Sequence, residues 1–356
     1  MQDEWHLDEY QKSFDAELAR KYIEQDKSED EILEFLPDLY EDALKKVSDS
    51  LFLELEERAP AMLREHRTLR RGFVRRNCAR WQRGFDLLER LIVISQETGS
   101  AINTALRPSA VDSRDAVFEA IIPNHARAVQ ISREILTLMM AGFPDGALGR
   151  WRTLHEIAVI SLFISEHGQP VAERYVLQDQ VTAWRRAKNY MEHHERANLQ
   201  PVEKDVLDRL EANSEEIISR YGDNMKSDYG WASPVLNKEK PLFADLEKAT
   251  KLDHWRPRYK WATQNTHGSY RSLGSTLATC ESERPVLAVG ESNSGMTDPA
   301  HMTAISLNAA TLPVIMLEPN LDRLAVARIS DRLSDEIGEA FFRLDRETRK
   351  RAREKR

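Results

Sequence analysis

The sequence lacks the features typical of secreted, membrane and disulfide-rich proteins. It has only two cysteines, Cys78 and Cys280, so neither a disulfide framework nor a zinc site built on thiolates is supported. No uncharged apolar run approaches the roughly 18 residues of a membrane-spanning helix. The acidic N-terminus, MQDEWHLDEY, lacks the apolar core of a signal peptide. These absences predict a cytoplasmic protein that does not enter a membrane.

Motifs of the common enzyme classes are also missing. There is no P-loop, no GxGxxG after a strand and no GxSxG, which leaves kinase, dehydrogenase and hydrolase interpretations without support. No histidine has a glutamate three residues before it, so the di-iron signature of helical bundles is absent. His193, His194 and Glu195 are adjacent and would diverge on a helix, which favours a solvated face. We expect neither a cofactor nor a metal site.

Helices account for most of what is present. Glycine and proline number only 14 each and 31% of the residues are charged, a composition that favours helices. Apolar periodicity and capping residues predict helical segments at 8–25, 29–58, 60–99, 114–141, 147–166, 171–197, 201–221, 242–251, 258–281, 300–317 and 320–352. Gly99, Ser100, Pro108 and Ser109 indicate a break. The prediction is an all-α fold: a multi-helix bundle (111–282) with a charged helical N-terminal region (1–110) and a C-terminal helical pair with a basic tail (283–356).

The segment 147–166, ALGRWRTLHEIAVISLFISE, is expected to be the central helix. Its apolar residues point in every direction at about 100° per residue, which is typical of a helix buried on all sides. Its first turns nevertheless carry four ionisable side chains: Arg150, Arg152, His155 and Glu156. Because charged groups are almost never buried without a partner, another part of the chain must supply one.

The segment 258–281 could supply that partner. Arg152 and Glu156 lie four residues apart on one face of the helix, and His267 is expected in the middle of a helix that also carries Tyr259 and Asn265. Packed together, Arg152, Glu156 and His267 would form one buried cluster. Two interpretations remain open: a salt-bridge network that fixes helix register, or a site in which histidine carries a proton and arginine holds an anion. In the second case Tyr259, Asn265 and Trp231, from the irregular stretch 222–257, would contact the substrate.

Arg150 and His155 have four residues between them, which resembles the Arg-(four to six residues)-His motif of the HEPN ribonucleases. The resemblance implies metal-independent RNA cleavage at a dimer interface, with arginine on the scissile phosphate and histidine transferring a proton. Trp151 departs from the polar residue that usually follows the arginine. On a regular helix the two positions lie about 140° apart, so they converge only if Arg150 belongs to a frayed first turn.

A longer stretch carries a second resemblance. GRWRTLHEIAVISLFI, the later YGWA and the segment THGSY are together similar to a family of uncharacterised, largely bacterial helical proteins, known only as a domain of unknown function. The resemblance covers about residues 112–280. It implies a helical fold and a joint importance of Arg152, Glu156 and His267, and it supplies no activity; a role in defence against phage is a loose implication.

The charges are unevenly distributed along the chain. Residues 1–60 hold 19 acidic and 7 basic side chains, whereas residues 61–83 hold eight arginines and one glutamate. One interpretation is that the acidic helices dock on the Arg-rich one, within the chain or across a dimer. Another is a phosphate- or RNA-binding face formed by Arg64, Arg67, Arg70, Arg71, Arg75 and Arg76.

Two functions therefore stand as hypotheses. The first is an RNA-cleaving toxin or anti-phage defence effector of HEPN-like type, an endoribonuclease that acts as a homodimer and uses Arg150, Arg152, His155, Glu156 and His267. The second is a non-catalytic regulatory or interaction protein, whose acidic N-terminal helices bind a protein partner and whose cluster is structural.

Overall fold

The computed structural model describes residues 9–20, 28–268, 276–284 and 286–354. Within these ranges it contains eleven α-helices, several short 3₁₀ helices and no β-strand, which confirms the all-α prediction. The chain divides into two compact units, residues 1–73 and 74–356. In the described ranges no helix is both long and apolar enough to cross a membrane.

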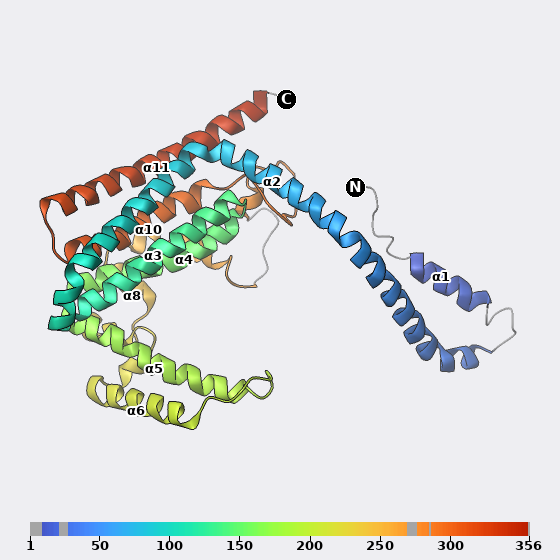
Figure 1. Cartoon of the computed structure of the whole chain (residues 1–356), viewed down its shortest axis with the longest axis horizontal. Coiled ribbons are helices and arrows are strands. Elements are labelled where there is room, and N and C mark those ends of the chain that lie inside the picture. The colour runs from blue at the N-terminus through green and yellow to red at the C-terminus, as the bar shows by residue number, and fades with distance from the viewer. Residues whose placement is uncertain (1–8, 21–27, 269–275, 285, 355–356) are drawn as a thin grey trace. The chain divides into compact units, whose positions relative to one another are not determined.

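The helix α2 runs without interruption from Glu29 to Ser113 and belongs to both units (Figure 1). The break predicted around Gly99 and Pro108 is therefore wrong. Ile102 and Ala110 are buried and continue the core-facing side of the helix, so tertiary packing outweighs the weak helix propensity of the glycine and proline. In the first unit, α1 (Glu9–Leu18) packs Phe14 edge-on against Tyr40 of α2, with the ring centroids 5.4 Å apart.

The second unit holds the other helices. They are α3 (Ala116–Met140), α4 (Pro144–His167), α5 (Gln169–His193), α6 (Lys204–Tyr221), α7 (Ser233–Leu236), α8 (Phe243–Ala249), α9 (Arg256–Thr263), α10 (Thr297–Met316) and α11 (Leu321–Glu354). Most agree with the predicted segments, including the closing helical pair α10 and α11. There are two exceptions: α7 lies in the stretch 222–257, where only a helix at 242–251 is predicted, and α9 ends at Thr263 whereas the predicted helix continues to residue 281.

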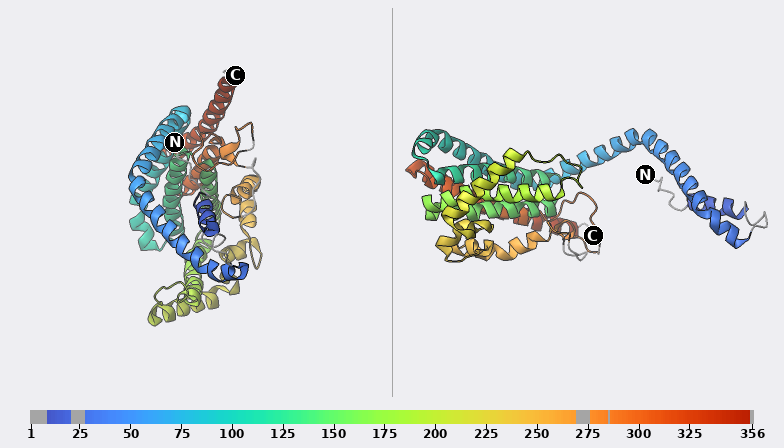
Figure 2. Two further views of the ribbon diagram at one scale, coloured as in Figure 1. Left: turned by 90° about the vertical axis from the view of Figure 1, so that its right-hand side faces the viewer. Right: turned by 90° about the horizontal axis from the view of Figure 1, so that it is seen from below.

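The core of this unit lies where α3, α4 and α10 pack against one another. Figure 1 shows α3 and α4 running side by side, and Figure 2 shows the same pair from two further directions. Leu154, Val159 and Phe163 of α4 have no exposed surface, in agreement with the prediction of a central helix buried on most sides. The helix α5 leaves the core and pairs with α6.

The C-terminal half of α2 packs against α11, and its Asn77 side chain donates to the Met139 carbonyl at the end of α3. Trp81 of α2 stacks on Phe341 of α11 with ring centroids 5.5 Å apart, and both side chains are fully buried. Gly84 lies one turn further along α2, and a Cβ atom at this position would come within 2.6 Å of the Phe341 ring. The glycine is therefore needed for the close approach of the two helices.

Candidate functional site

The polar residues of α4 contact the short helices α8 and α9. Gly149 makes the approach possible, because a Cβ atom there would already lie 3.2 Å from the Cβ of Asn265, in the turn that follows α9. Beyond Gly149, the successive turns of α4 present Arg152, His155 and Glu156 to this segment. The helices α8 and α9 thus supply partners for the charges of α4, as expected from the sequence, but through residues other than the predicted His267.

His155 is the most deeply buried of these side chains, at 2% exposure. Its Nε2 lies 3.0 Å from Oε1 of Glu247 in α8, and Glu247 has no exposed surface. The other carboxylate oxygen of Glu247 accepts a hydrogen bond from Nη1 of Arg256, at the start of α9. A buried carboxylate requires such partners because its desolvation is costly. The three residues therefore fasten α8 and α9 to α4.

Aromatic rings enclose the His155 imidazole. The ring centroids of Trp151, Phe243 and Tyr259 lie 5.3, 5.9 and 5.9 Å from its own. Trp151 is itself anchored, because its Nε1 donates to Oγ of Ser306 in α10 over 2.9 Å. These contacts leave the imidazole almost no exposed surface.

A second group of polar residues lies nearer the surface. Nη2 of Arg152 is 3.2 Å from Oε1 of Glu156, and the two side chains are 29% and 26% exposed. The Tyr259 hydroxyl donates to the same carboxylate oxygen, and the Arg152 guanidinium lies 4.9 Å from the centroid of the Tyr259 ring. Nε of Arg152 is buried and has no hydrogen-bond partner among the described residues.

The phenols of Tyr259 and of Tyr229, whose ring centroid lies 6.0 Å from that of Phe243, remain protonated at neutral pH. Burial raises the pKa of Tyr259, and the hydrogen bond to Glu156 and its negative charge raise it further. Burial also raises the pKa of Tyr229 to about 12, with smaller contributions from the charges of Glu156 and Asp228. Tyr259 therefore acts as a hydrogen-bond donor that holds Glu156, not as a base.

Arg150 and His155 do not face a common site. Arg150 lies in the second turn of α4, which is regular from Pro144, so the frayed first turn that the HEPN-like geometry requires is absent. Its Nε donates to Oε2 of Glu134 in α3, whereas His155 turns to Glu247 in α8. The two side chains thus bind different elements, as their angular separation on a regular helix predicts.

The predicted inclusion of His267 in the buried cluster is also wrong. His267 is exposed and lies beyond the end of α9, and no hydrogen bond or ion pair among the described residues joins it to Arg152, His155 or Glu156. Backbone bonds from Asn265 and Thr266 to residues three positions earlier tighten the last turn and end the helix. Residues 269–275, the rest of the predicted helix, lie outside the described ranges.

The residues predicted to bind substrate are dispersed. Tyr259 belongs to the cluster, and Asn265 packs against Gly149. Trp231 is 1% exposed and its ring packs against Phe163 and Tyr175, so it is a core side chain. The remaining two, Arg71 and Arg75, are exposed on α2.

Buried Arg174 explains why the irregular stretch around Trp231 is ordered. It donates to the backbone oxygens of Trp231, Tyr221 and Gly230 and to the side chain of Asn224 over 3.0–3.2 Å. The sequence does not indicate that Arg174 and Glu247 are buried. Neither carries a local signal, because arginine and glutamate in polar helices are ordinarily solvated.

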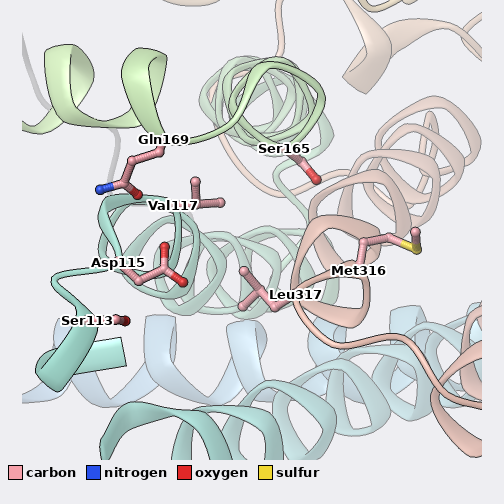
Figure 3. A pocket seen from close by; sticks show the side chains of 7 residues that line it. All are labelled: Ser113, Asp115, Val117, Ser165, Gln169, Met316 and Leu317. Atoms are coloured by element: carbon pink, nitrogen blue, oxygen red, sulfur yellow. The ribbon is translucent and has the colours of Figure 1, made fainter. Parts of the chain in front are cut away.

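A hollow of about 420 Å³, lined by no residue of either cluster, lies between the start of α3, the junction of α4 with α5 and the end of α10 (Figure 3). Two of its polar side chains accept hydrogen bonds from backbone amides. Asp115 caps α3 by accepting from the Phe118 amide, and Gln169 accepts from the Ala116 amide. In the part of the chain that the structure describes, no group of three or more His, Cys, Asp or Glu side chains could hold a metal ion.

These observations define a class: an all-α protein in which a buried His–Glu pair with a partly exposed arginine, and a partly exposed Arg–Glu–Tyr cluster, join short peripheral helices to a central one. Residues 118–284 match the model of a family of unknown function (DUF5677). The match spans α3 to α9 and so includes every residue of both clusters, and it agrees with the resemblance inferred from the sequence. No curated protein and no solved structure matches the chain.

Proposed function

We propose that this protein is a non-catalytic helical interaction protein. The clusters on α4 fix the packing of α8 and α9, whereas α2 binds a partner. The observation that carries the proposal is the enclosure of His155, which is 2% exposed with Nε2 directed at Glu247. A general acid or base must come within hydrogen-bonding distance of its substrate. An imidazole surrounded by rings and a buried carboxylate is suited to holding helices together.

The rival function is metal-independent RNA cleavage of HEPN-like type, as a toxin or defence effector. It needs an arginine and a histidine on one phosphate. Arg150 is engaged by Glu134 and His155 by Glu247, on two different neighbouring helices. The exposed His267 could reach a solute but has no described contact with either cluster. These placements favour the structural role.

RNA cleavage in EDTA tests the choice. We expect purified protein to leave a fluorescently labelled single-stranded RNA intact, and His155→Gln to lower the melting temperature. His193→Gln, at an exposed position of α5, is the matched control and should change neither property. Cleavage by the parent protein that is abolished by His155→Gln or His267→Gln, with the melting temperature unchanged, would establish a nuclease instead.

The interaction element of this proposal is the N-terminal part of α2, where Arg71 and Arg75 are exposed. A reducing cytoplasm suits a chain whose Cys78 and Cys280 are both free thiols. Two thiols should then react with a thiol reagent after the protein is isolated and denatured without reductant. A count below two would contradict that location.

A further inference from the structure

An apolar stripe runs along the N-terminal part of α2. Its apolar residues form three rows, and positions within a row are spaced eleven residues apart. The first row contains Leu36, Val47 and Leu69, the second Tyr40, Leu51, Met62 and Phe73, and the third Leu44 and Leu55. Arg58 and His66 occupy the two remaining positions of these rows. Eleven residues make three turns of about 3.67 residues each, so the rows stay on one side of the helix along its length.

Much of this stripe is exposed within its own unit. Leu44 and Leu69 are 50% and 58% exposed, and Met62 is 45% exposed. Phe14 of α1 contacts the stripe at Tyr40, near one end. A single helix cannot bury an apolar face by itself, and a contiguous exposed apolar surface is typical of a binding site.

The charges of the same helix indicate what covers the stripe. From Glu29 to Glu57 it carries eleven acidic and two basic side chains, and from Arg58 to Arg71 five arginines and one glutamate. Because both stretches lie on one continuous helix, they cannot dock on each other within the chain: Asp42 and Arg67 are separated by about 38 Å at 1.5 Å per residue. A basic surface of another molecule would complement the acidic stretch, and an acidic surface would complement the Arg-rich one.

We propose that residues 36–73 of α2 form an antiparallel coiled coil with the same segment of a second copy of this chain. When residues 36–73 of the two copies are aligned antiparallel over their full length, the two-fold axis lies between residues 54 and 55. This alignment places Leu36 opposite Phe73 and Val47 opposite Met62, and lays the acidic stretch of each copy along the Arg-rich stretch of the other. A parallel pair would set acidic against acidic and basic against basic, which is destabilising.

The apolar part of the interface is tested by mass. We expect size-exclusion chromatography with light scattering to give twice the 41.0 kDa of the chain. Leu55→Glu combined with Met62→Glu should return the mass to that of one chain without loss of helical circular dichroism. Leu321→Glu, at an 85% exposed leucine that begins α11, is the matched control and should leave the dimer intact.

A charge exchange tests the complementarity. One variant carries Arg67→Glu, Arg70→Glu and Arg71→Glu, and the other carries Asp38→Lys, Glu41→Lys and Asp42→Lys. Each should be monomeric alone, because both ends of its interface would then carry one sign. An equimolar mixture should recover the dimer mass, and failure to recover it would overturn the proposed pairing of acidic with Arg-rich stretches.

Distances between spin labels test the orientation, in a Cys78→Ser, Cys280→Ser background. A label at Glu56→Cys should lie close to its counterpart in the second copy, whereas labels at Asp38→Cys should be separated by about 50 Å. Short distances at both positions would mean a parallel pair and would overturn the antiparallel assignment.

This inference rests on the part of the proposed function that makes α2 the interaction element. A parent chain that is monomeric at 100 µM would overturn the self-association and leave the structural role of His155 untouched. RNA cleavage that depends on His155 would overturn the proposed function and leave the coiled coil standing.

Discussion

His155 and Glu247 are both buried, and Nε2 of the imidazole lies 3.0 Å from Oε1 of the carboxylate. The two residues are 92 positions apart in the chain and belong to different helices, α4 and α8. Arg256 supplies the positive charge that a buried carboxylate requires, through the second oxygen of Glu247. Glu247 therefore links α4, α8 and α9 through a single carboxylate.

Glu247→Ala should destabilise the protein by about 1–3 kcal/mol, the cost of leaving a buried polar group, here the His155 imidazole, without its hydrogen-bond partner. The loss arises because His155 and Arg256 keep their polar groups but lose the carboxylate that they contact. Urea unfolding followed by circular dichroism measures the change.

Two further variants assign the cause of that loss. Glu247→Gln keeps a polar side chain of the same shape beside His155 and should cost less than Glu247→Ala. Glu192→Ala removes an exposed carboxylate from α5 and should fall within about 0.5 kcal/mol of the parent. If Glu247→Ala behaved like Glu192→Ala, the carboxylate could not be buried among these partners.

Tyr259→Phe should cost about 1 kcal/mol, the net value of a typical hydrogen bond. The substitution removes the hydroxyl that donates to Glu156 and keeps the ring beneath the Arg152 guanidinium and 5.0 Å from Phe243. Chemical unfolding of Tyr259→Phe, Glu156→Gln and the double variant measures the coupling between the two side chains. Additive losses would contradict a direct bond between them.

The order of the helices could be predicted from the sequence because apolar periodicity is a local property. Leu154, Val159 and Phe163 indicate a helix buried on most sides wherever that helix packs, and the structure buries all three. The polar residues of α4 likewise indicated that partners exist. The existence of a cluster was thus predictable from a short stretch of sequence.

The identity of the partners was not predictable from the same stretch. Glu247 lies in a short polar helix, and only the three-dimensional packing distinguishes it from a solvated glutamate. The error at His267 has a local cause that could have been recognised. The run Thr263 to Gly268 contains side chains that compete with helical hydrogen bonds, and such runs favour turns.

His125 should make stability depend on pH. Burial lowers its pKa to about 4 from an ordinary value of 6.5, and its Nε2 lies 3.2 Å from the Thr311 hydroxyl. Between these two values the unfolded chain binds a proton that the folded chain does not, so the free energy of unfolding falls as the pH is lowered from 6.5 towards 4. The shift corresponds to about 3 kcal/mol at 1.36 kcal/mol per pKa unit.

His125→Gln provides the comparison for that pH dependence, because glutamine is polar and does not titrate. The stability difference between parent and variant, measured by urea unfolding at several pH values, should move in favour of the variant as the pH falls from 7 to 4.5. A constant difference across this range would show that the imidazole is not held neutral in the folded protein.

Gly84→Ala should destabilise the protein although alanine is the better helix former. The added methyl group would lie 2.6 Å from Cε2 of Phe341, and overpacking of this kind costs about 1–3 kcal/mol, against a gain of about 1 kcal/mol in helix propensity. Gly146→Ala is the matched control: this glycine also lies in a helix, and the nearest atom to its added Cβ is 3.9 Å away, so the substitution should stabilise. Adding Phe341→Leu to Gly84→Ala should relieve the clash. Because Trp81 also stacks on Phe341, thermal unfolding of these variants measures how closely α2 and α11 pack, and equal gains from both glycine substitutions would contradict that contact.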